Sequence, residues 1–184
     1  MHPLLREYET DIDAISGTMV RLCFSLPRQR NDLQKLAADS GVPLSTPMHV
    51  ASFDPARADV IHSATIQDQL HSLSDGGEDE VLIGNVCVSY IYSLWEDGYR
   101  LRVAKLRGGH TKNEVRSDLF GELGAYRHAI IHNHAVGTSK TRKLMLLPPV
   151  PEGTAVRVDR HMFELLVKAV KKELHAISLP RRAA

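Results

Sequence analysis

Residues 127–133 bring together, within two helical turns, side chains suited to acid–base chemistry and to phosphate binding. Arg127 is followed by His128, His132 and Asn133. An arginine stays charged and offers a planar fork of N–H donors that matches phosphate oxygens. A histidine has a reference pKa of about 6.5, which suits proton transfer near neutral pH. This stretch is therefore the first candidate for a catalytic site.

The candidate residues lie on a predicted helix over residues 118–137, about five turns long at about 3.6 residues per turn. Four apolar residues fall within about 60° of Arg127 on a helical wheel: Phe120, Leu123, Ile130 and Ile131. We expect this stripe to face the core, so that Arg127 needs a partner, a phosphate or a wet cleft. His128 and His132, at i and i+4, are neighbours on one face of the same helix.

Composition and charge set the class of protein. The chain has 184 residues, 43% of them hydrophobic and 24% charged, which is typical of one globular domain with a core of its own. A net charge of +1 excludes coating of nucleic acid by the whole surface, so an RNA or DNA site has to be a local patch. The two cysteines are too few for a disulfide framework. We expect a cytoplasmic protein, because no apolar run reaches about 18 residues and the first residues are charged.

Residues 1–76 are predicted to form an N-terminal helical extension or subdomain. Pro27 is expected to end its first helix, because proline has no N–H to donate. Asp54 is expected to cap its last helix. The predicted elements are a helix at 4–26, a short helix at 31–38, an irregular stretch that permits a strand at 49–53, and a helix at 54–73.

Residues 77–184 are predicted to form the core bundle. A long helix over 79–106 has a wide apolar surface and should lie centrally, with Gly98 marking a bend or a close helix crossing. Two short extended pieces around a proline turn, over 143–158, suggest a small hairpin. Asp159 is expected to cap a last helix over 160–177. The predicted fold is all-α: a bundle of five or six helices with a minor extended or hairpin element before the last one.

The motif YRHAIIHN at residues 126–133 resembles that of the HEPN superfamily of small helical bundles. Its ribonuclease members carry an arginine, four to six residues and then a histidine, often with a polar residue after the arginine. Here Arg127 and His132 are separated by four residues, and His128 occupies the polar position. The context is similar, because a long helix with SYIYSLWEDGYR precedes the motif and a final helix follows. The resemblance covers about residues 79–177.

The resemblance implies a metal-independent endoribonuclease that needs no cofactor. RNA is cleaved without a metal when a base removes the 2′-hydroxyl proton and another group offsets charge on the phosphate, leaving a 2′,3′-cyclic phosphate. On this interpretation His132 is the acid/base group, Arg127 binds the phosphate and His128 is auxiliary. Substrate binding is assigned to three further polar residues: Asn133, Lys140 and Arg142.

The same resemblance implies the partners: an RNA substrate, a second copy of the chain and an antitoxin or defence-system protein, with no membrane. Two protomers usually pair so that their motif helices line one cleft. Gly124 and Ala135 lie near the histidine side of the helix, which would permit a close helix approach. Some toxins of this superfamily have a modifiable tyrosine two residues after the motif histidine. That position holds His134 here, so regulation by this route is not expected.

Other interpretations of these residues stay open at this point. The chain is alternatively a catalytically inactive bundle of the same class that binds a nucleotide or a protein. A second alternative is a metal site at the histidine cluster, since HxxxH is a known ligand spacing, although no cysteine or carboxylate lies close in sequence. Arg127 is alternatively a structural residue paired with one of three acids: Glu96, Asp97 or Glu122. Its backbone diverges from that of His132 by about 140°, so only a long side chain or a second protomer brings both to one phosphate.

Overall fold

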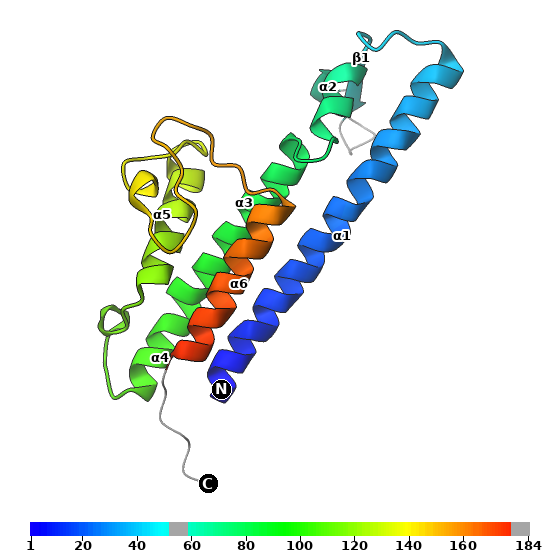
Figure 1. The fold of residues 1–184 in the computed structure, drawn as a ribbon. Coiled ribbons are helices and arrows are strands. Elements are labelled where there is room, and N and C mark those ends of the chain that lie inside the picture. Colours follow the sequence, from blue (N-terminus) through cyan, green and yellow to red (C-terminus); the bar gives the residue numbers. More distant parts are fainter. Residues whose placement is uncertain (52–58, 178–184) are drawn as a thin grey trace. The chain divides into compact units, whose positions relative to one another are not determined.

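The computed structural model describes residues 1–51 and 59–177 of the chain. Helices make up most of these residues, together with one small antiparallel sheet (Figure 1). The predicted all-α bundle with a minor extended element is therefore confirmed. Among the described residues, no helix is both long and apolar enough to cross a membrane.

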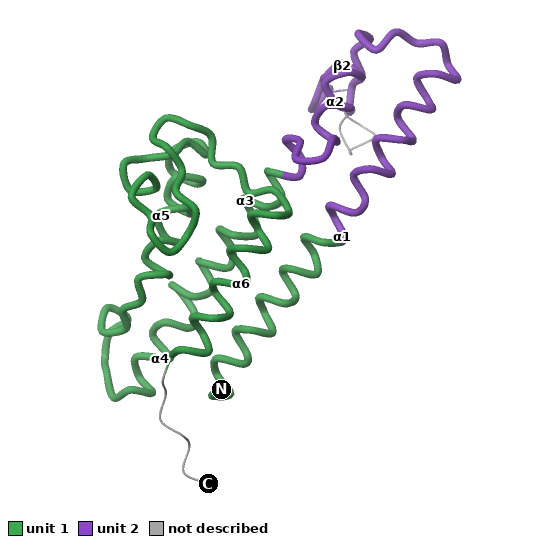
Figure 2. The backbone as a smooth tube through the Cα atoms, in the orientation of Figure 1, with its two compact units in different colours: residues 1–20, 81–184 green, residues 21–80 purple. Residues whose placement is uncertain are grey.

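The chain divides into two compact units (Figure 2), one built from residues 1–20 and 81–184 and the other from residues 21–80. The boundary expected after residue 76 lies close to the second division. The first 20 residues, which we grouped with the N-terminal extension, share a unit with the C-terminal part. Tyr8 illustrates the reason, because it is fully buried and its hydroxyl donates to the carbonyl of Ile91 at 2.7 Å.

Helix α1 runs without a break over Pro3–Ser40 and contains Pro27 in its interior. The prediction of two helices separated at Pro27 is therefore wrong. A proline inside a helix removes one backbone hydrogen bond and costs about 3 kcal/mol. Packing of the later turns offsets this cost, since Ala37 belongs to a buried apolar cluster with Ile66 and Leu70.

The unit of residues 21–80 also contains a hairpin and a short helix. Strands β1 (Pro47–Ala51) and β2 (Val60–Thr65) pair antiparallel. Helix α2 (Ile66–Ser72) follows at once. It begins there because Thr65 and Asp68 form a capping box, in which each side chain accepts a hydrogen bond from the backbone of the other.

The hairpin of this unit replaces part of a predicted helix. The helix predicted over 54–73 is wrong over residues 60–65, which form a strand. This run contains valine, isoleucine and threonine, whose branched side chains favour a pleated sheet when a partner strand is present. The strand permitted at 49–53 is confirmed for its described part, residues 49–51. The expected cap Asp54 lies outside the described residues.

A long helical segment leads into the other unit, as predicted over 79–106. It consists of α3 (Glu78–Ser93), a π-helical turn η1 (Leu94–Tyr99) and α4 (Arg100–Leu106). The wider turn is visible in the N–H of Arg100, which donates to the carbonyl of Trp95, five residues back. Gly98 lies in this turn, and apart from its own helix no described part of the chain comes within 4 Å of the position of an added Cβ. It therefore accompanies a change of helical geometry and not a close crossing.

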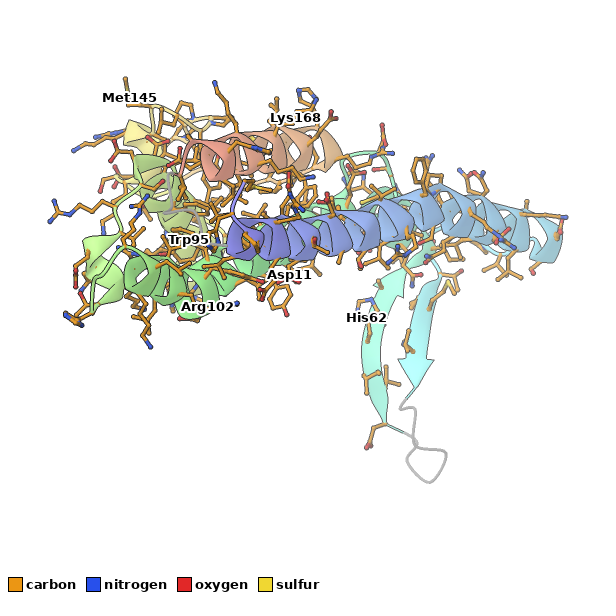
Figure 3. The ribbon with its side chains drawn as sticks, turned by 90° about the horizontal axis from the view of Figure 1, so that it is seen from below. Asp11, His62, Trp95, Arg102, Met145 and Lys168 are labelled. Atoms are coloured by element: carbon orange, nitrogen blue, oxygen red, sulfur yellow. The ribbon has the colours of Figure 1, made fainter. Side chains whose placement is uncertain are left out.

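Aromatic side chains from three elements form the core of the unit of residues 1–20 and 81–184. Trp95 of η1 stacks on Phe120 of α5 (Asp118–His132), with ring centroids 4.0 Å apart. The ring centroid of Tyr8 of α1 lies 6.0 Å from that of Trp95. Trp95 is only 1% exposed and lies within the packed helices (Figure 3). Because large aromatic residues dominate core energetics, this cluster fixes the first turn of α5 against the π-turn.

The last helix forms as predicted. Helix α6 covers Arg160–Ala176, and the carboxylate of Asp159 accepts a hydrogen bond from the backbone N–H of Met162 at 2.8 Å. Along this helix an apolar stripe is buried, with Leu166, Val170 and Leu174 at 1% exposure or less. Lys168 lies on the outward face of α6 (Figure 3).

The chain between α5 and α6 is extended and turn-rich, but the small hairpin expected at 143–158 is not formed among the described residues. An isolated bridge joins Ala155 to Val136, and a 3-10 helix, η3, covers Thr141–Lys143. Prolines interrupt this segment repeatedly and cannot donate to a strand ladder. The buried Thr141 connects the two sides of this segment. Its hydroxyl accepts a hydrogen bond from the N–H of Thr138, and its one proton lies within reach of the carbonyls of Thr138 and Val150.

Candidate active site

Helix α5 carries the candidate catalytic residues and has well-defined ends. The hydroxyl of Ser117 accepts a hydrogen bond from the first turn and caps the N-terminus. The helix ends at His132, earlier than the predicted end at residue 137. His134 and Ala135 adopt positive φ angles of 51° and 56°, which a right-handed helix does not allow. His132 therefore lies in the last turn, where its side chain is exposed.

The buried face of α5 is centred on Leu123 and not on Arg127. Its members are Leu119, Phe120, Leu123, Tyr126 and Ala129. Ile131, which we expected in the stripe, is 52% exposed. Tyr126 is fully buried instead, and its hydroxyl donates to the carbonyl of Pro148. The buried face is therefore rotated around the helix axis relative to the predicted stripe. Arg127 lies half-buried at the edge of this face.

Arg127 and His132 are in direct contact. Nη1 of the arginine lies 2.8 Å from Nε2 of the histidine, at the protein surface. A guanidinium has only donors, so Nε2 must accept and the proton of the neutral ring lies on Nδ1. Although the two residues leave the helix in directions about 140° apart, the arginine side chain is long enough to reach the histidine. A phosphate-binding group and a proton acceptor therefore meet within one protomer.

His128 completes what we call the motif cluster, formed by Arg127, His128 and His132. The ring centroids of the two histidines are 5.2 Å apart with an interplanar angle of 45°, and both side chains are exposed. In the described part of the chain, no group of three or more histidine, cysteine, aspartate or glutamate residues is placed to hold a metal ion. The cluster is thus one cation beside two imidazoles on an open surface.

The acids considered as structural partners of Arg127 are engaged elsewhere. Glu96 binds Arg100 and Lys112, each with an N–O distance of 2.8 Å. Burial by itself would raise the pKa of Glu96, but the hydrogen bonds from Lys112 and Arg100 outweigh it and hold this pKa below its usual range. Among the described residues, Asp97 makes no ion pair with Arg127 either. The prediction of a structural pair with an acid therefore finds no support.

Glu122 has a different role, which the sequence did not reveal. Its carboxylate accepts hydrogen bonds from the backbone N–H groups of Met145, Leu146 and Leu147 at 2.8, 2.9 and 2.8 Å. The side chain of Met145 is 87% exposed and points away from the helices (Figure 3). Glu122 thus anchors the loop after η3 to α5. The contact could not be predicted from the sequence, because its partners are backbone N–H groups more than 20 residues away and every residue type except proline has one.

The three predicted substrate-binding residues lie outside the contact between Arg127 and His132. The side-chain amide of Asn133 donates to the carbonyl of Val136 at 2.7 Å and so stabilises the turn after α5. Lys140 is exposed at the start of η3. Arg142 is exposed and lies 3.6 Å from Glu152. Asn133 therefore has a structural contact, and the two basic residues belong to the connection that follows the site.

Tyr92 of α3 is the neighbouring residue that sequence reasoning missed. A Cβ added at Gly124 would lie 2.9 Å from the Tyr92 hydroxyl, so the ring packs directly on this glycine. The close approach expected there for a second helix is therefore occupied by a side chain of the same protomer. Burial raises the pKa of Tyr92, with the charge of Glu96 adding to the rise and those of Arg100 and Arg127 opposing it. Tyr92 is thus a neutral phenol beside the motif cluster.

Taken together, the site offers a fixed positive charge, an unprotonated imidazole nitrogen, a second imidazole and a neutral phenol on one accessible surface. Such a set can bind a phosphate and transfer a proton from an adjacent hydroxyl. Comparisons of the chain with models of known protein families, with curated proteins and with solved structures give no match.

Proposed function

We propose that the protein is a metal-independent endoribonuclease of the HEPN type that acts as a homodimer. The observation that carries the proposal is the 2.8 Å contact between Arg127 and His132, with His128 beside them. The motif alone left this point open, because the two backbones face different sides of the helix. The contact supports a shared role for the two side chains on one phosphate.

In the proposed reaction, Arg127 turns from His132 to the scissile phosphate and pairs two of its oxygens. This frees the lone pair of Nε2, which removes the proton of the ribose 2′-hydroxyl. The 2′-oxygen attacks phosphorus, the bond from phosphorus to the 5′-oxygen breaks, and the leaving 5′-oxygen takes up the proton that Nε2 of His132 carries. The products are a 2′,3′-cyclic phosphate and a 5′-hydroxyl. Arg127 offsets the negative charge that builds on the phosphate.

The remaining groups have supporting roles in this proposal. His128 orients the phosphate, since its ring lies beside that of His132. Lys140 and Arg142 attract the RNA strand towards the motif cluster from the connection after α5. With a net charge of only +1, the chain relies on such local charges for phosphate contacts. Asn133 is no longer assigned to the substrate, because its amide holds the turn at Val136.

The dimer and the biological setting come from the resemblance. Two protomers would place their α5 helices along one composite cleft, with the exposed side chains of His128, Ile131 and His132 facing it. Because Tyr92 fills the space over Gly124, the two helices would approach at their C-terminal turns. We place the activity in prokaryotic defence or growth control in the cytoplasm, under an antitoxin or defence-system partner.

The test is cleavage of a mixed RNA by the purified chain in excess EDTA, beside Arg127→Ala and His132→Ala. We expect cleavage by the native chain, 2′,3′-cyclic phosphate ends, and loss of activity in both variants at an unchanged circular dichroism spectrum. Arg28→Ala and His175→Ala remove exposed residues of the same types and should cleave normally.

Cleavage that survives both substitutions, or that EDTA abolishes, would overturn the proposal. A folded dimer that binds RNA without cutting it would favour the catalytically inactive binding module instead. Cleavage is read from a gel, and RNA binding is measured in parallel on the same protein preparations.

A further inference from the structure

A cavity of about 250 Å³ opens between the π-turn η1 and the beginning of α5, in the same unit as the motif cluster. The stacked rings of Trp95 and Phe120 form its deep wall, and Arg116 and Asp118 lie at its rim. Pockets for drug-sized ligands usually enclose about 300–1,000 Å³. This cavity is slightly smaller, so it suits a single small ring system. π-Helical turns occur frequently at functional sites.

The charges around the cavity come in opposite pairs. Glu96 is held by Arg100 and Lys112. At the rim, Arg116 and Asp118 are exposed, and in the described part of the chain neither makes a hydrogen bond or an ion pair through its side chain. A phosphate would meet the carboxylates of Glu96 and Asp118 here, and two of the basic groups, Arg100 and Lys112, are already paired with Glu96. A nucleobase instead offers N–H donors to carboxylates and ring acceptors to guanidinium groups.

The cavity and the motif cluster are connected through Tyr92. This residue lines the cavity, and its hydroxyl end packs on Gly124 of α5. From Gly121, at the cavity wall, to Arg127 the helix advances about 9 Å at about 1.5 Å per residue. The two residues are also about 120° apart around the helix axis, so the link between the sites is Tyr92, whose pKa burial raises and the charge of Arg127 lowers. A phosphate bound at Arg127 therefore lies on the Tyr92 side of the cavity.

We propose that this cavity binds the nucleobase next to the phosphate held by Arg127, with Tyr92 as the contact between the two sites. The identity of the ligand rests on the proposed endoribonuclease function. The cavity adds a base-binding position to a cluster whose own groups contact only phosphate and ribose.

Trp95 makes the proposal directly measurable, because it is the only tryptophan of the chain and it lines the cavity. The full chain is titrated with each of the four ribonucleoside 3′-monophosphates while tryptophan fluorescence is recorded. Ribose 5-phosphate is the control, since it has sugar and phosphate but no base. We expect a saturable change with at least one nucleotide and none with the sugar phosphate.

Gly121 provides a matched pair of variants. It lies at the cavity wall, and apart from its own helix no described part of the chain comes within 4 Å of the position of an added Cβ. Gly121→Leu adds a large side chain at the cavity wall and should weaken the fluorescence response, whereas Gly121→Ala should keep it. Arg116→Ala, at an exposed rim position, should weaken binding without affecting folding.

Three results would overturn the base-binding proposal: no saturable change with any nucleotide, an equal response to ribose 5-phosphate, or native titrations from both Gly121→Leu and Arg116→Ala. Arg127→Ala separates this proposal from the proposed function, because it should lose RNA cleavage but still show a saturable fluorescence change, at weaker affinity since the phosphate contact is lost. If the native chain binds nucleotides but never cuts RNA, the base-binding proposal is supported and the proposed nuclease function is wrong. If it cuts RNA without any fluorescence response, the nuclease stands and the cavity proposal fails.

Discussion

The guanidinium of Arg127 donates to Nε2 of His132 across a distance of 2.8 Å, so in the free protein the arginine covers the lone pair that would act as the base. A phosphate that draws Arg127 away would expose this nitrogen at the moment when the substrate is bound. Substrate binding and activation of the base are thereby coupled through one side chain. Such coupling also keeps the imidazole in one tautomer before the RNA arrives.

Gly124→Ala should disturb the site through Tyr92. The added Cβ would lie 2.9 Å from the tyrosine hydroxyl and 3.0 Å from its ring, so the ring must move. We expect weaker RNA cleavage, and little or no gain in the free energy of unfolding despite the higher helix propensity of alanine. Urea unfolding and cleavage rates of the variant measure both effects.

Gly121→Ala is the matched control in the same helix, with open space at its Cβ position. It should raise the free energy of unfolding by about 0.5–1 kcal/mol, the usual difference between alanine and glycine in a helix interior. Equal stabilisation by the two substitutions would contradict the packing of Tyr92 on Gly124.

Glu122→Ala should release the loop at residues 145–147. Three backbone N–H groups lose their acceptor, and because the carboxylate is partly exposed we expect the free energy of unfolding to fall by about 1–2 kcal/mol. Hydrogen exchange of these three amides should become fast. Glu164→Ala, which removes an exposed carboxylate bound to Lys168, is the control and should leave the stability close to that of the native chain. Unchanged exchange at 145–147 would show that Glu122 does not anchor the loop.

Low pH should reduce the free energy of unfolding partly through Glu96, which lines the cavity. Although burial opposes it, the hydrogen bonds from Lys112 and Arg100 lower the pKa of Glu96 in the folded state. The unfolded state therefore binds more protons in acid, and the stability contributed by Glu96 is present above its unfolded pKa of about 4.3 and lost as the pH falls through the folded value. Urea unfolding at about pH 6 and about pH 3 should show a smaller loss for Glu96→Gln than for the native chain. An identical loss in both proteins would contradict this role.

Local signals in the sequence were enough for several elements. Asp159 before an apolar stripe predicted α6, and the long apolar run over 79–106 predicted the segment of α3, η1 and α4. In both cases the residues that start the helix lie next to the stripe that buries it. The identity and spacing of Arg127 and His132 likewise pointed to residues that the structure brings into contact.

The errors arose where distant packing outweighs local preference. Pro27 stays inside α1 because later turns, including Ala37, pack against another segment. The run 60–65 is a strand because a partner strand lies beside it. Tyr92 packs on Gly124 of α5, and Glu122 of α5 binds the backbone of residues 145–147. No residue spacing along the chain predicts either of these tertiary contacts.

The joint action of Arg127 and His132 is tested most directly by a double-mutant cycle on RNA cleavage. We predict that Arg127→Ala lowers kcat/KM by about 10²–10³-fold. His132→Ala should lower it by about 10²–10⁴-fold. The double variant should be no worse than the more damaging single one, because groups that act as a unit give non-additive losses. Losses that multiply, or a single variant that cleaves RNA at the native rate, would contradict a shared site at these two residues.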